Sequence, residues 1–161
     1  MLEKQLELNG IKLGVPPFHL TMYKFKHHKY DMVRWYSPYM YTHNCGYKFR
    51  FKVNLNWNPT ILWLWKEVYV SVFFLSEVGE FDATLHWPAR FTITLQLLNQ
   101  HRDQDHITVT KTFQWERGYD SQYYTEKLIA HTDLELNAQK QTQYLKDDCL
   151  HFCITKIEAQ K

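Results

Sequence analysis

A strict two-residue alternation near the end of the chain constrains the fold more than any other feature. In the segment 144–157, YLKDDCLHFCITKI, a polar turn leads directly into alternating apolar and polar side chains. One face of the segment carries Leu150, Phe152 and Ile154, and the other face carries His151, Cys153 and Thr155. A helix would repeat its apolar residues every three or four positions, whereas a period of two indicates a strand with one buried face. The segment therefore predicts a half-buried β-strand.

The same alternation recurs along the chain, separated by polar turns. The segments that carry it, or a short part of it, are 18–22, 48–57, 91–97, 107–113, 128–130 and 149–157. Val68 to Leu75 is apolar at nearly every position, which is typical of a central strand covered on both sides. One short helical turn is expected near 133–137, and the His27-His28 pair is expected in a turn. The pattern predicts an all-β protein, an antiparallel β-sandwich of seven or eight strands.

The length suits one domain with a short appendage. The chain has 161 residues, enough to bury roughly 70% of the unfolded surface without a disulfide or metal. The first residues, MLEKQLELN, are helix-like, with Leu2 and Leu6 four apart and Gly10 placed to end the helix. We therefore predict an N-terminal helical stub or linker over 1–15 and a folded domain over 16–161, which begins at Pro16-Pro17.

Charge and cysteine content exclude several classes of protein. The net charge is +2, and no run of Lys or Arg is long enough for a nucleic-acid or membrane patch. No stretch of 18 apolar residues and no signal-peptide pattern is present, so we predict no membrane insertion. Cys149 and Cys153 are too far apart along a strand, about 13 Å, for a disulfide. With Cys45 they are expected to be reduced, which predicts a cytoplasmic protein.

Catalytic and metal-binding patterns are missing from the sequence. The nine histidines are scattered, with no His-Glu-x-x-His or Cys-x-x-Cys pattern. His101 and His106 alone are too few for a structural zinc. His131, Thr132 and Asp133 are neighbours that point apart on a strand, so they predict a strand end and a capped turn instead of a catalytic triad. We predict no enzyme activity and no cofactor.

Several short motifs occur in a fixed order. They are Trp35-Tyr36-Ser37-Pro38 with Tyr41-Thr42-His43, Gly46-Tyr47-Lys48, Gly79-Glu80-Phe81-Asp82 with Trp87-Pro88, and the closing Tyr144-Leu145-Lys146-Asp147-Asp148. Together they span roughly 16–157. This ordered set resembles the meprin-and-TRAF-homology (MATH) domain, most closely the C-terminal domain of TNF-receptor-associated factors (TRAFs). The resemblance implies a β-sandwich that binds extended peptide tails of receptors or signalling adaptors and does not catalyse a reaction.

The resemblance also implies which residues would contact a peptide. The positions that contact peptide in the family correspond to Lys52, Asn54, Asn58, Phe73 and Phe113 of this sequence. Lys52 stands where the family has Arg and loses the planar fork that binds a carboxylate. The two asparagines replace a Tyr and an Asp, and Ser121 is the only serine near the family's serine cluster. A ligand that differs from the usual TRAF motif is therefore expected, unless these polar residues form only a solvated strand face.

Two alternatives use the same sandwich differently. MATH domains of ubiquitin-ligase adaptors, which this chain also resembles, hold Ser/Thr-rich segments in an aromatic groove. The corresponding aromatics are Trp115, Tyr119, Tyr123 and Tyr124, some of which could instead cover the core. The other alternative is a divergent copy whose groove is unused.

In TRAF-like proteins a coiled coil runs into the domain, so 1–15 could be either the end of a trimer-forming stalk or a frayed terminus. The apolar run Ile61 to Trp65 could pack over the sandwich or contact a partner.

Overall fold

Two β-sheets form the body of the protein. The computed structural model describes residues 11–12, 15–57, 68–118 and 122–160. The strands in these residues are β1 (Ile11–Lys12), β2 (Phe18–Met22), β3 (Trp35–Tyr36), β4 (Tyr39–Tyr41), β5 (Lys48–Trp57), β6 (Tyr69–Ser76), β7 (Ala89–Leu97), β8 (Ile107–Trp115), β9 (Gln122–Ala130) and β10 (Leu150–Ala159). The helical elements are α2 (Phe25–Tyr30), η2 (Asp82–Thr84) and η3 (His131–Asp133). The predicted all-β sandwich is confirmed, with the short β1, β3 and β4 added to seven longer strands.

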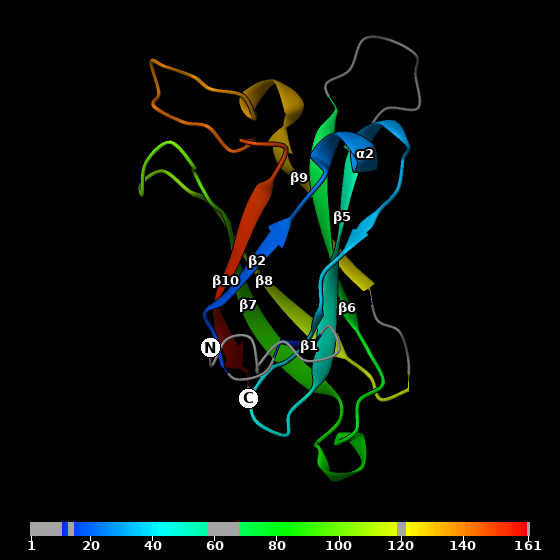
Figure 1. Cartoon of the computed structure of the whole chain (residues 1–161). Helices are drawn as coiled ribbons and strands as arrows, with labels where there is room; N and C mark the ends of the chain where they lie inside the picture. The colour runs from blue at the N-terminus through cyan, green and yellow to red at the C-terminus, as the bar shows by residue number, and fades with distance from the viewer. Residues whose placement is uncertain (1–10, 13–14, 58–67, 119–121, 161) are drawn as a thin grey trace.

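The strand order places β8 and β9 at sheet ends. One sheet runs β1-β4-β5-β6-β9, with β3 also paired to β5, and the other runs β2-β10-β7-β8 (Figure 1). All pairs are antiparallel except β1 with β4. β8 therefore pairs with β7 alone and β9 with β6 alone among the described strands. An end strand carries unpaired N–H and C=O groups along its outer edge.

The predicted alternation builds the core between the sheets. Leu150, Phe152 and Ile154 of β10 are fully buried, as the sequence pattern requires. The Phe152 ring lies 5.4 Å from the ring of Phe51 on β5, so aromatic side chains join the two sheets. Burial of one such side chain contributes roughly 1.5–3 kcal/mol. The two-layer packing follows from these inward faces.

Some local predictions were wrong. The His27-His28 pair lies in the helix α2 and not in a turn. The helical turn expected near 133–137 comes earlier, as η3, and no side chain caps it. Phe73 and Leu75 of β6 are only half-buried, so this central strand is covered fully on one side only. These features depend on neighbouring segments that a local pattern does not identify.

One end of the sandwich carries α2 and the long connection between η3 and β10 (Figure 1). The N–H groups of Phe25 and Lys26 donate to the backbone and side-chain oxygens of Asp148, both at 2.9 Å, and hold the two segments together.

Several predictions fall partly or wholly outside the described residues. Of the predicted stub over 1–15, the structure describes Ile11–Lys12, which form β1, and residue 15. The domain boundary at 16 stays a prediction. The run Ile61 to Trp65 lies outside the described residues, as do Asn58, Tyr119 and Ser121.

Candidate functional site

Lys52 lies in the middle of the outer face of the six-stranded sheet. On β5 it stands opposite Tyr36 of β3 and Phe73 of β6. Directly opposed residues of paired strands share a face. The side chain is nevertheless only 6% exposed, and its Nζ lies 4.3 Å from the centre of the Phe73 ring. A cation over an aromatic face is favourable, and more so when water is excluded.

The electrostatic surroundings of Lys52 favour an anion. Burial lowers the pKa of Lys52 below its ordinary value, and the positive charge of Arg34 lowers it further. Among the described residues, the ion pairs include no carboxylate bound to Lys52 or Arg34. A buried charge normally requires a partner of opposite sign. An acidic group placed here would supply it.

Further cations and aromatic rings extend this face along β5. The Lys48 Nζ lies 4.3 Å from the centre of the Tyr39 ring, and the Arg50 guanidinium lies 4.5 Å from that of Tyr36. The Arg50 Nε also pairs with Glu77 at 2.9 Å. We name the set Arg34, Tyr36, Lys48, Arg50, Lys52 and Phe73 the basic-aromatic face.

Asn54 lies two residues beyond Lys52 but is engaged locally. It is half-buried, and its Oδ1 accepts a hydrogen bond of 3.0 Å from the Asn56 N–H. The Asn56 side chain in turn donates to the Lys29 carbonyl oxygen at 3.1 Å. These bonds fix the end of β5 against the end of α2.

The structure places Phe113 and Trp115 in the hydrophobic core. They are 3% and 0% exposed, on β8 of the opposite sheet. The Phe113 ring lies 4.9 Å from that of Phe74. The structure does not bring these two residues together with Lys52 and Phe73. Both were expected to contact a peptide, but both are buried in the core instead, as the alternative interpretation of Trp115 had it. Tyr123 lies on β9 with its backbone opposite Phe74.

The free edge of β9 is close to the basic-aromatic face and carries an irregularity. Tyr124 of β9 stands opposite Phe73, which stands opposite Lys52, so one row of positions leads from the face to the edge. Farther along, Val70 pairs with Ile129 but Val72 pairs with Thr125. Two extra residues are therefore inserted in β9, which is a β-bulge.

The site also contains residues that the sequence reasoning missed. Arg34 and Tyr36 were not predicted as site residues, although Tyr36 belongs to the Trp35-Tyr36-Ser37-Pro38 motif and Arg34 immediately precedes it. The two-residue strand β3 pairs Tyr36 with β5, Arg34 comes directly before this strand, and so short a strand leaves no periodic signal. A search for cations and aromatics two positions apart could have found Tyr36.

Histidines and cysteines show no metal-binding arrangement in the described part of the chain. The His106 Nδ1 accepts a hydrogen bond from the Asn99 N–H, and its Nε2 contacts Asp103, both at 2.9 Å. Within the described ranges there is no group of three His, Cys, Asp or Glu side chains able to hold a metal. Cys45, Cys149 and Cys153 are free thiols. None of the described helices has the length and apolar character needed to cross a membrane.

Comparisons with known proteins identify the family of this chain. The sequence model of the family described as TRAF/meprin, MATH domain matches residues 32–153. The chain belongs to this family, whose domains generally act as protein-interaction modules. The resemblance found in the sequence is confirmed.

Individual relatives are TNF-receptor-associated factors. TNF receptor-associated factor 5 of Mus musculus is 30% identical over 125 residues, which are 71% of this chain and 21% of that protein. TNF receptor-associated factor 6 of Danio rerio is 31% identical over 123 residues, with the same two shares. The chain thus spans about a fifth of the length of these relatives. The solved structure of TRAF5 from Notothenia coriiceps has a TM-score of 0.71 at 21% identity, covers 99% of this chain and 80% of that chain, and shows the shared fold.

Proposed function

We propose that this domain is a non-catalytic, cytoplasmic interaction module that binds an extended acidic peptide from a receptor or signalling adaptor. The observation that carries the proposal is Lys52, a 6% exposed cation without a carboxylate partner among the described residues. It lies one strand, β6, away from an end strand that can accept a peptide through main-chain hydrogen bonds.

The spacing of the strands suits a peptide that uses both features. Lys52 on β5 is two strand spacings from β9, about 10 Å. An extended chain covers that distance in about three residues. A peptide paired with the β9 edge near Tyr124 and then crossing β6 would therefore bring an acidic side chain to Lys52. The half-buried Phe73 ring lies beneath this path.

The charge pattern predicts the chemistry of the ligand. Lys48, Arg50 and Lys52 alternate along one face of β5, and among the described residues the one ion pair there joins Arg50 and Glu77. A Lys ammonium binds an anion as a point charge, without the bidentate geometry of Arg. We therefore expect selection for an acidic residue with tolerance between Asp and Glu. Asn54, which is bonded locally, is expected to contribute little.

Selection from a random library of twelve-residue peptides tests the proposal, followed by affinity measurement on the recovered peptides. We expect enrichment of an acidic position, and binding roughly ten- to hundredfold weaker in Lys52→Met, because a hydrogen bond to a charged group contributes about 1.5–3 kcal/mol. Met retains the length of the buried side chain. Lys156→Met, at an exposed lysine on β10 of the other sheet, is the matched control and should bind almost normally. Unchanged affinity in Lys52→Met would overturn the proposal.

The same selection separates the alternative functions. A substrate-recruiting adaptor for ubiquitin ligases is favoured by the aromatic part of the face, where Tyr36 is 42% exposed, and would enrich Ser/Thr-rich peptides without an acidic position. A divergent copy with an unused groove would enrich no peptide.

Assembly of the full protein would strengthen weak single sites. We propose that a coiled coil upstream of the domain forms a homotrimer, as the helix-like first residues suggest. Three linked sites raise the effective concentration of a multivalent partner without new contacts at each site. Sedimentation of a chain extended upstream of Met1 should then give a trimer, and a monomer would refute this part of the proposal.

A further inference from the structure

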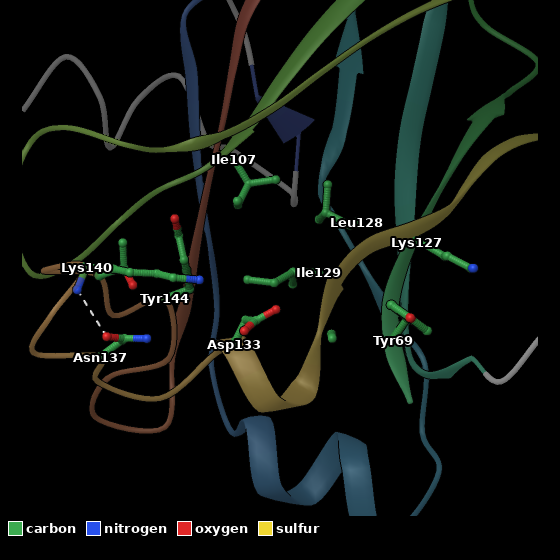
Figure 2. Close-up of a pocket in the computed structure, with 11 residues that line it drawn as sticks. Tyr69, Ile107, Lys127, Leu128, Ile129, Asp133, Asn137, Lys140 and Tyr144 are labelled. Atoms are coloured by element: carbon green, nitrogen blue, oxygen red, sulfur yellow. Dashed lines mark hydrogen bonds between the residues drawn. The ribbon is translucent and has the colours of Figure 1, made fainter. Parts of the chain in front are cut away.

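A cavity of about 390 Å³ lies where β9 ends. Its lining comes from the last residues of β9, the first residues of β6 and β8, the last residue of η3, and the connection that follows η3. Figure 2 shows Ile129 and Asp133 beside each other in the middle of the lining, with Ile107 on one side and Tyr69 on the other. The cavity thus adjoins the free edge of the six-stranded sheet.

The floor of the cavity is apolar because of the bulge in β9. In a regular strand successive side chains point to opposite faces. Leu128, Ile129 and Ala130 are instead consecutive and all 7% exposed. The two inserted residues fall between the Thr125 and Ile129 pairings, the stretch that contains Leu128 and leads into Ile129 and Ala130. The bulge re-aims these side chains and leaves an apolar hollow beside the edge.

The rim of the cavity is polar and carries both charges. Asp133 and Lys140 line it together with Thr142. The Asn137 Oδ1 accepts a hydrogen bond of 3.0 Å from the Lys140 N–H, which fixes the turn on this side (Figure 2). Figure 2 shows the Lys127 side chain directed away from Ile129 and Asp133. A rim with both signs gives no net preference for charge, so the apolar floor decides what enters.

The bulge also limits how far a peptide can follow β9. Hydrogen bonding along an edge requires regular spacing of the exposed N–H and C=O groups, and a bulge interrupts the ladder. A peptide paired beside Gln122–Thr125 would lose register at the bulge. Its next side chains then lie beside the cavity.

We propose that this cavity receives one large apolar side chain of the bound peptide and so acts as a second anchor. The inference rests on the proposed peptide binding and specifies its second contact. The position of Val70, beside the cavity, and that of Phe73 are three residues apart on β6, which is about 10 Å along the strand. Lys52 lies about 10 Å farther across the sheet. An extended peptide covers this path of about 20 Å in about six residues. The ligand is therefore an extended segment with an apolar residue and an acidic residue about six positions apart.

Selection of the twelve-residue library on variants of the cavity tests the inference. Thr142 is half-buried and lines the cavity, so Thr142→Trp should fill the space. We expect this variant to lose the enriched apolar position but keep the acidic one, whereas Lys52→Met should lose the acidic position and keep the apolar one. Thr155→Trp is the matched control, since Thr155 is also half-buried but lies on β10, away from the cavity. It should select the same peptides as the unmodified domain.

The outcomes separate the two proposals. Enriched acidic peptides without an apolar position at this spacing, or an apolar position that survives in Thr142→Trp, would overturn the second anchor and leave the proposed function standing. Recovery of no peptide would overturn both.

A titration with N-acetyl-leucinamide, followed through the methyl NMR signals of Ile107 and Ile129, supplies an independent measurement. Shifts that saturate, and that are lost in Thr142→Trp, would support the anchor. Unchanged signals would count against it even if peptides bind.

Discussion

Two of the buried serines, one beside β5 and one within β6, differ in what their hydroxyl groups contact. The Ser37 Oγ accepts a hydrogen bond from the Phe51 N–H and donates one to the Pro38 carbonyl oxygen, both at 2.9 Å. The Ser71 Oγ is buried without a hydrogen-bond partner in the part of the chain that the structure describes. A buried polar group without a partner loses its hydration and gains nothing in return. Ser37, in the link between β3 and β4, therefore holds this link against β5, while Ser71 adds a polar atom inside the sheet.

Replacement of each serine by alanine should have different effects. Ser37→Ala should lower the free energy of unfolding by about 1–3 kcal/mol, because the buried Phe51 N–H loses its acceptor. Ser71→Ala should be neutral or raise stability by up to about 1 kcal/mol. Urea unfolding of the two variants provides the comparison, each serving as the other's control. Equal losses in both would contradict this account of the two hydroxyl groups.

The end strand β8 contains a charged residue at a core-facing position. Lys111 stands opposite Ile93, which is buried, and its neighbours Val109 and Phe113 on the same side pack into or against the core. Lys111 itself is exposed. Inward-pointing charges on end strands prevent the edge from pairing with another chain. β8 is protected in this way, which is consistent with a peptide joining the sandwich at β9.

Removal of this charge should promote self-association. We expect Lys111→Ile to associate as its concentration is raised, because β8 then presents a continuous β-prone edge. Sedimentation velocity over a concentration series measures the effect. Lys26→Ile, an exposed position on the helix α2, controls for added apolar surface and should remain unchanged. A variant of Lys111 that behaves like this control would refute the protective role.

At the scale of the whole molecule, His131 joins several elements at one end of the sandwich. Its Nε2 lies 2.5 Å from the Leu55 carbonyl oxygen of β5, and its ring lies 5.9 Å from that of Phe25 in α2. Burial lowers the pKa of His131 below its ordinary 6.5; the bond to Leu55 acts in the opposite direction, and the charge of Lys29 lowers it further. The folded protein therefore favours neutral His131.

This shift predicts a pH dependence of stability. Because the folded pKa lies below the unfolded one, the unfolded chain takes up a proton at His131 more readily as pH falls below about 6.5. Stability should therefore decrease from pH 7 downward through this window. His131→Gln, which retains a donor for Leu55, should show a smaller decrease in urea unfolding, whereas the exposed His101→Gln should behave like the unmodified protein. An undiminished decrease in His131→Gln would assign the effect to other groups.

Part of the candidate site could be predicted from the sequence. Lys52 and Phe73 were named through the family resemblance, and the structure brings them into contact. Phe113 was named in the same way but lies in the core. A matching position gives a residue's place on a strand, whereas its exposure also depends on what the opposite sheet places over it. Burial of Lys52 could not be predicted either, because it depends on Tyr36 and Phe73, which the neighbouring strands β3 and β6 place beside it.

The sequence by itself determined that the segments of β5, β7 and β10 are strands, and which of their faces are buried. The alternation in β5, β7 and β10 is a local property, and burial of one face per strand follows from the hydrophobic effect. Only the tertiary structure decided which strands became neighbours, and so where the edge, the buried cation and the cavity lie. A two-residue period specifies a face but not a partner, and the bulge in β9 arises only from the register between β9 and β6.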